Sequence, residues 1–220
     1  MQILNIKEVN KFIYIAFSFF AITLSSCKHS IDDFNSYMEY LADKDNGLVK
    51  EKSIGGIQLK VKYLPNDYLV YNDIKQNKQV TKGLVDSVKL TYDNSITFMM
   101  VLGPDKNESF DITRVGVANY EEFAQRIEEM NFNMMQHVKL QVNNEEYSPE
   151  LYQMESTYGL EQSRKFLFVF KAKDEKSNTI LKGDFQFVYA DEMFNTGINK
   201  FQFKHSDVNA IPKFNFFSYK

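Results

Sequence analysis

Cysteine, proline and tryptophan are scarce in this chain of 220 residues, which has one Cys, four Pro and no Trp. The single cysteine excludes an internal disulfide framework and a zinc site built from several cysteines. An excess of basic residues is also missing, since 26 Lys and Arg stand against 29 Asp and Glu. The chain therefore lacks the electrostatic footprint of a nucleic-acid-binding protein, and we expect no nucleic-acid partner. A hydrophobic fraction of 44% is typical of a globular protein.

The apolar run near the start of the chain is too short to cross a membrane. Residues 12–24 carry no charge and would span roughly 20 Å as a helix, whereas the hydrocarbon core of a bilayer is about 30 Å thick. Lys7 and Lys11 give the preceding segment a modestly basic character, which Glu8 dilutes. This arrangement is typical of a cleaved signal peptide.

The apolar run ends in Leu24-Ser25-Ser26-Cys27, a motif that resembles the lipobox of bacterial lipoproteins. The resemblance covers the first 27 residues only. It implies that the chain is cut between Ser26 and Cys27, that the Cys27 thiol receives a diacylglyceryl group, and that the new amine is acylated. The alternative is an uncleaved anchor with Cys27 buried as a structural thiol, which the short apolar run disfavours.

The lipobox divides the chain into a signal peptide (residues 1–26), a short lipidated tether (27–29) and a single domain (30–220). No linker rich in Pro, Ser or Gly interrupts the last segment. Lys28 resembles the residue that permits transport of lipoproteins to the outer membrane, and residues 27–33 loosely resemble the acidic tether of surface lipoproteins in Bacteroidetes-type bacteria. We therefore expect a lipid anchor in the outer membrane, with the domain facing the periplasm or the cell surface.

The first half of the domain mixes helical and strand patterns. Residues 30–42 place their apolar side chains on one helical face with Ser30 as the cap, and residues 56–64 alternate as a strand. Residues 67–79 fit either a short helix or an irregular connection. Residues 84–102 favour a hairpin around Asp93 and Asn94, but residues 80–92 also keep helical spacing, so both alternatives stay open there.

The second half of the domain is richer in strand patterns. Residues 110–117 predict a strand, and Asn119 begins a helix whose buried stripe is Phe123, Ile127, Met130 and Met134. A short helix is expected over residues 148–159. Further strands are expected over residues 138–142, 164–173, 180–190, 198–204 and 214–216. The sum is an α+β protein, an antiparallel meander whose Phe-rich face is packed by two or three helices.

The segment around Met130, Met134 and His137 offers the ligand types that Cu(I) prefers. The two methionines also continue the apolar stripe of the predicted helix, where they would fill the core. No Met-rich repeat or second pair of histidines accompanies them, so we favour the core interpretation and predict neither a metal site nor a cofactor.

Catalytic constellations are missing from the sequence. The three histidines are His29 in the tether, His137 and His205, and none has the partners of a nucleophile–base–orienter relay. Acidic residues in 43–47 and 103–107 deviate from the spacing of calcium loops and are better interpreted as turns. We therefore predict that the protein is not an enzyme; an enzyme that uses scattered carboxylates is the third-ranked alternative.

Aromatic residues are in surplus, with 20 Phe and 13 Tyr. Those near predicted loops and chain ends are candidates for a binding patch or a lipid cavity, namely Tyr68, Tyr71, Phe194, Phe217 and Tyr219. The leading functional hypothesis is a lipid-anchored, non-catalytic subunit of an outer-membrane or surface assembly, which binds the membrane through Cys27 and binds an envelope protein partner. The alternative is a carrier or sensor that holds a hydrophobic ligand between the sheet and its helices.

Overall fold

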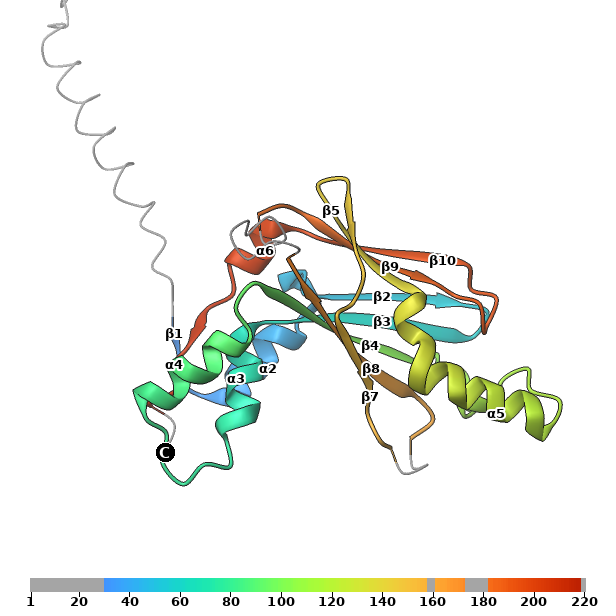
Figure 1. Ribbon diagram of the computed structural model, residues 1–220, viewed down its shortest axis with the longest axis horizontal. Helices are drawn as coiled ribbons and strands as arrows, with labels where there is room; N and C mark the ends of the chain where they lie inside the picture. Colours follow the sequence, from blue (N-terminus) through green and yellow to red (C-terminus); the bar gives the residue numbers. More distant parts are fainter. Residues whose placement is uncertain (1–29, 158–160, 173–181, 219–220) are drawn as a thin grey trace, which may run out of the picture.

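The computed structural model describes residues 30–157, 161–172 and 182–218, and it has an α+β fold built around two antiparallel sheets (Figure 1). The larger sheet has the strand order β2 (Val49–Ile54), β3 (Ile57–Leu64), β4 (Ser95–Pro104), β8 (Arg164–Lys171) and β7 (Leu151–Met154). The smaller sheet has the order β10 (Ile198–Phe203), β9 (Phe185–Ala190), β5 (Val138–Val142) and β6 (Glu145–Tyr147). A separate parallel pair joins β1 (Ser30–Ile31) to β11 (Lys213–Phe214), the two ends of the described chain.

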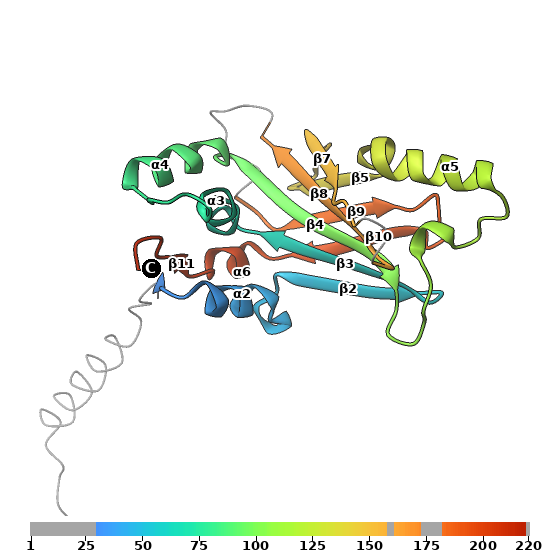
Figure 2. The ribbon, with the colours of Figure 1, turned by 90° about the horizontal axis from the view of Figure 1, so that it is seen from below.

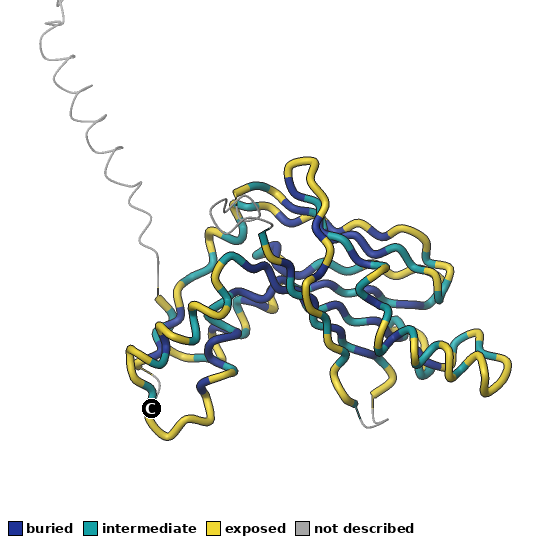
Figure 3. The backbone as a smooth tube through the Cα atoms, in the orientation of Figure 1, coloured by how far each residue is buried: buried dark blue, intermediate teal, exposed yellow. Residues whose placement is uncertain are grey.

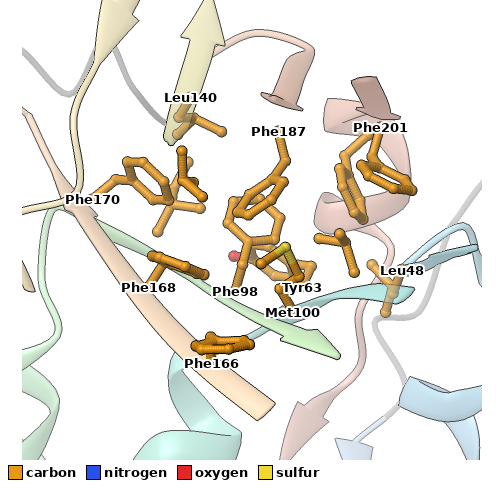
Figure 4. Close-up of a cluster of buried hydrophobic side chains, with 14 of the residues drawn as sticks. Leu48, Tyr63, Phe98, Met100, Leu140, Phe166, Phe168, Phe170, Phe187 and Phe201 are labelled. Atoms are coloured by element: carbon orange, nitrogen blue, oxygen red, sulfur yellow. The ribbon is translucent and has the colours of Figure 1, made fainter. Parts of the chain in front are cut away.

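The two sheets pack against each other through rings of phenylalanine. Along β8, Phe166, Phe168 and Phe170 are fully buried on one face, as the alternating pattern requires. Phe98 of β4 lies at the centre, with its ring 5.2 Å from that of Phe187 on the opposite sheet. Figure 4 shows these rings interdigitating between the strands. The expected Phe-rich packed face is confirmed, and much of its cover comes from the second sheet.

The helices gather at the two ends of the sheets. One end carries α2 (Phe34–Ala42), α3 (Asn66–Ile74), α4 (Lys82–Thr91) and α6 (His205–Asn209) (Figures 1 and 2). The other end carries α5 (Tyr120–Glu128), which continues through the π-helical turn η4 (Glu129–Asn133) and the 3-10 turn η5 (Met134–Gln136). The central strands are the most buried part of the chain and the tip of α5 is exposed (Figure 3). The helices thus lie at two separate ends of the molecule (Figure 1).

The expected hairpin over residues 84–102 is half wrong. Its second arm is β4, but its first arm is the helix α4, capped by the Thr81 hydroxyl, which accepts a hydrogen bond from the Leu84 N–H. Packing decides between the two patterns, because the residues with helical spacing all lie against the hydrophobic core. These residues are Val80, Leu84, Val88 and Tyr92.

Two further predictions of secondary structure are wrong. Residues 110–117 contain the short 3-10 turn η3 (Ile112–Arg114) in place of a strand, because the Asp111 carboxylate accepts from the Thr113 N–H and hydroxyl and caps the turn. Residues 148–159 contain the strand β7 in place of a helix. Pairing with β8 provides hydrogen-bond partners for the backbone of β7 and stacks the Tyr152 ring on Phe168. Residues 158–160 lie outside the described part of the chain.

Several boundaries also shift. The first helix begins at Phe34 with Asp33 as its cap, because Ser30 is taken up in the pairing of β1 with β11. The ambiguous stretch after Pro65 contains α3. The strands β2 and β6 and the helix α6 were not expected, and β9 begins at Phe185, while residues 173–181 lie outside the described part. The strands expected over residues 56–64, 138–142, 164–173 and 198–204 and the helix start at Asn119 are confirmed. Of the strand expected over residues 214–216, only Phe214 lies in a strand, β11, which pairs in parallel with β1.

Candidate functional site

Several aromatic side chains line a groove of about 410 Å³ at the end of the molecule where the described chain begins. One wall is formed by α3 and the loop after it, and the other by β11 and the segment that follows. We call this hollow the aromatic groove. It is lined by Tyr71, Ile74, Lys75, Asn77, Lys78, Gln79, Val80, Phe214, Phe216 and Phe217.

The base of the aromatic groove is a rigid cluster of rings. Phe34 of α2 stacks on Tyr71 of α3 with a centroid separation of 3.5 Å, and Phe214 meets the Tyr71 ring edge-on at 5.4 Å. Phe214 also meets Phe216 edge-on at 5.1 Å. These four rings are buried or half-buried, whereas Phe217 is 56% exposed. The groove therefore combines a fixed aromatic base with one ring that is available to an external partner.

Hydrogen bonds connect the groove wall to the start of the described chain. The Asn215 N–H donates to the Ile31 carbonyl at 2.9 Å, and its side-chain amide donates to Asp32 at 2.9 Å. The Phe214 N–H donates to the Asp67 carboxylate of α3 at 3.0 Å. These hydrogen bonds hold Ile31 beside the groove. The start of the described chain is therefore held at the same end of the domain.

Cys27 lies outside the described residues, three positions before Ser30. Three residues of chain span at most about 11 Å when fully extended. A group attached to Cys27 would therefore begin within about 11 Å of Ser30. Ser26, the residue before the expected cleavage position, also lies outside the described part of the chain.

The lining of the groove carries two lysines and no carboxylate. Lys75 donates to the Asn72 side chain at 2.9 Å, which keeps its ammonium group near the end of α3. Beside the groove, the Lys89 ammonium group lies 4.9 Å from the centre of the Phe216 ring and 3.0 Å from Asp67. The groove is therefore an aromatic surface with a locally cationic rim.

Only part of the expected aromatic patch forms this surface. Phe217 is exposed, but Tyr71 is buried in the base of the groove and Tyr68 is half-buried. Phe194 lies at the other end of the molecule, where the Arg126 guanidinium stacks 4.6 Å from its ring centre. Tyr219 lies outside the described residues. The contribution of Lys75 and Lys78 was not predicted, because both fall in the ambiguous stretch 67–79.

The three candidate copper ligands are each engaged in other contacts: the two methionines in the core and the histidine in a hydrogen bond. Met130 and Met134 are fully buried and belong to the hydrophobic core. The His137 ring is hydrogen-bonded through Nε2 to Glu129 at 2.5 Å. Burial raises the pKa of Glu129, but hydrogen bonds from His137 and Asn133 outweigh that effect and lower the pKa overall. Among the described residues, no group of three or more His, Cys, Asp or Glu side chains is placed to hold a metal ion.

The other polar motifs are engaged in local structure. Asp43 caps the turn η2 (Lys44–Asn46) by accepting from the Asp45 N–H, and Asp105 accepts from Ser53 and from the Asn107 N–H. In α6, Ser206 donates to its neighbour Asp207 at 3.2 Å. His29 lies outside the described residues. The two acidic segments form turns, in agreement with the interpretation from sequence.

Comparisons with protein-family models, with curated proteins and with solved structures found no match to this chain. Within the described residues, no helix combines the length and the apolar character needed to cross a membrane. The functional interpretation therefore rests on the geometry of the chain itself.

Proposed function

We propose that this protein is a lipid-anchored envelope domain, held against the outer membrane through Cys27, that acts as a non-catalytic binding or structural subunit. The observation that carries the proposal is the pairing of β1 with β11. This pairing fixes Ser30, three residues after the lipobox cysteine, beside an aromatic groove with a cationic rim. The lipobox supplies the anchor, and the groove supplies a surface suited to the bilayer beside it.

The energetics support this orientation. A single acyl chain gives only reversible membrane binding, whereas two or three chains, at about 0.8 kcal/mol per buried CH₂, hold a protein at the bilayer durably. A phenylalanine on the apolar face of an interfacial segment buries its ring at the boundary between headgroups and acyl chains, and a lysine near an anionic leaflet contributes about 1 kcal/mol. Phe217, Lys75 and Lys78 add these contributions once the lipid has brought the groove to the surface.

The opposite end of the molecule is then turned away from the membrane. Tyr120 at the start of α5 is 82% exposed and Phe132 in η4 is 71% exposed. Exposed aromatic side chains are enriched among the residues that dominate the energy of protein–protein binding. We propose this end as the surface offered to an envelope protein partner.

The absence of tryptophan gives a direct test of the orientation, because each Trp substitution introduces a single fluorescent reporter. The full lipidated chain is reconstituted in vesicles that contain brominated phospholipids, as Phe217→Trp and, for the control, as Tyr120→Trp. We expect the reporter at position 217 to have blue-shifted, quenched emission and the reporter at position 120 to remain unquenched. Equal quenching at the two positions, or quenching at 120 alone, would contradict the proposed orientation.

The partner is tested by site-specific photocrosslinking in the intact envelope. A photoreactive residue at position 120 or 132 should give one defined adduct, while the same residue in place of exposed Lys52 on β2 should not. Adducts that are the same at all three positions, or recovery of the monomer alone, would count against a dedicated partner.

The aromatic groove also favours a second candidate function, which is transport or sensing of a hydrophobic ligand. The groove lies between a helix and a strand, although not between the helices and the main sheets, where the sequence placed it. Native mass spectrometry of the detergent-extracted protein distinguishes the two functions. A ligand that stays bound to the wild type and is lost from Phe217→Ala supports the carrier, and an unliganded protein contradicts it.

A further inference from the structure

The outer face of the four-stranded sheet carries a polar hollow of about 500 Å³, which shares no lining residue with the aromatic groove. A row of side chains crosses all four strands there, because the pairing places Glu146 opposite Gln141, Gln141 opposite Gln186, and Gln186 opposite Gln202. We call this hollow the amide hollow. At the strand spacing of about 4.8 Å, the row is about 14 Å long.

The side chains of the row are linked in pairs. The Gln141 side-chain amide donates to Glu146 at 2.8 Å, and the Gln186 amide donates to the Gln202 side-chain oxygen at 3.2 Å. Each of these bonds uses part of the capacity of an amide, which has two donor hydrogens and an acceptor oxygen. The inner faces of the same strands are buried in the phenylalanine core, so the row rests on a rigid platform.

The rim of the amide hollow is also fixed. Asn143 and Asn144 form the turn between β5 and β6, with φ angles of 48° and 68°, and their side chains are exposed. Asp184 accepts a hydrogen bond from the His205 N–H at 2.8 Å. Gly183 permits the close approach of Asn143, since a Cβ atom at Gly183 would lie 2.5 Å from the Asn143 Oδ1 atom.

The chemistry of the lining selects one class of ligand. Amide and carboxylate groups make up the lining, with no apolar and no basic side chain. The carboxylates of Glu146 and Asp184 disfavour phosphates and other anions, and a hydrophobic ligand would leave the polar groups unpaired. Amides both donate and accept, as the hydroxyl groups of a sugar do. From this we infer that the amide hollow binds a neutral oligosaccharide along the row from Glu146 to Gln202.

The experiment uses the full lipidated chain in micelles of a detergent without a sugar headgroup. Maltohexaose, cellohexaose, mannohexaose and chitohexaose are titrated into the millimolar range by calorimetry, together with hexagalacturonate as an anionic comparison. We expect at least one neutral hexasaccharide to bind. No binding by any of the four, or binding of hexagalacturonate alone, would overturn the inference.

Variants then locate the site. Gln141→Ala and Gln186→Ala each remove a hydrogen-bonding group and should weaken binding by about tenfold. Gly183→Ala removes no polar group but displaces the Asn143 side chain, and it should also weaken binding. The matched control is Lys200→Ala, two residues from Gln202 on the same face of β10, which should leave binding unchanged. Binding that the first three variants leave intact would place the sugar elsewhere and overturn the assignment.

Discussion

Phe214 fixes the end of the domain where the described chain begins, and its removal should destabilise the whole protein. The side chain is only 4% exposed. Its ring lies between 5.1 and 5.7 Å from the rings of Phe34, Tyr37, Tyr71 and Phe216. Phe214→Ala should lower the free energy of unfolding by about 3–5 kcal/mol, the usual cost of truncating a buried phenylalanine. The upper part of that range is expected because aromatic pairs add about 0.5–1.5 kcal/mol each beyond area burial.

Thermal unfolding of the chain from Lys28 onward, followed by circular dichroism and calorimetry, measures this effect. For a domain of this size each kcal/mol lowers Tm by about 2–4 °C, so Phe214→Ala should lower Tm by about 6–20 °C. Phe217→Ala is the matched control, because the same residue type three positions later is 56% exposed and should change stability by less than about 0.5 kcal/mol. Equal decreases in Tm for the two variants would refute the claim that the buried ring contacts of Phe214 stabilise the domain.

Three further substitutions test other parts of the fold. Asn119→Ala should cost about 1 kcal/mol in urea denaturation, because Asn119 caps α5 by accepting from the Glu122 N–H at 3.0 Å. Arg164→Met should cost about 2–3 kcal/mol by the same measurement, since the buried guanidinium binds both oxygens of Asp111, which keeps some contact with solvent. Burial raises the pKa of Asp191, but hydrogen bonds from the N–H and hydroxyl of Thr196, the Met193 N–H and the Tyr189 hydroxyl outweigh it and lower the pKa overall. The difference in unfolding free energy between wild type and Asp191→Asn should therefore be constant above about pH 5 and shrink as the pH falls below about 4; a difference that grows in acid would contradict this.

The strands of the core were predictable because their side chains alternate over a full strand length. Phe166, Phe168 and Phe170 on one face of β8 illustrate this, and the apolar residues between them correctly indicated a strand with neighbours on both sides. Residues 80–92 were harder, because period-two and helical spacing coincide there over a short window. The Thr81 cap and the contacts with the core decide for the helix, and the second of these depends on tertiary structure.

The candidate sites depend on contacts between distant parts of the chain. Phe217 was identified from its place near the chain end, but the wall opposite it became visible only once β1 paired with β11. No periodicity signals a parallel pair of two residues each. The row of Gln141, Gln186 and Gln202 is equally hidden in the sequence, because it depends on the register of three strands.

Lipidation of Cys27 is the central claim, and intact-mass and peptide mass spectrometry of the protein extracted from membranes tests it most directly. Our account predicts a chain that begins at Cys27, carries diacylglycerol on the thiol and bears an acyl group on the new amine, with Cys27→Ser losing these modifications and leaving the membrane fraction. A chain that keeps residues 1–26 and carries an unmodified thiol at Cys27 would contradict it.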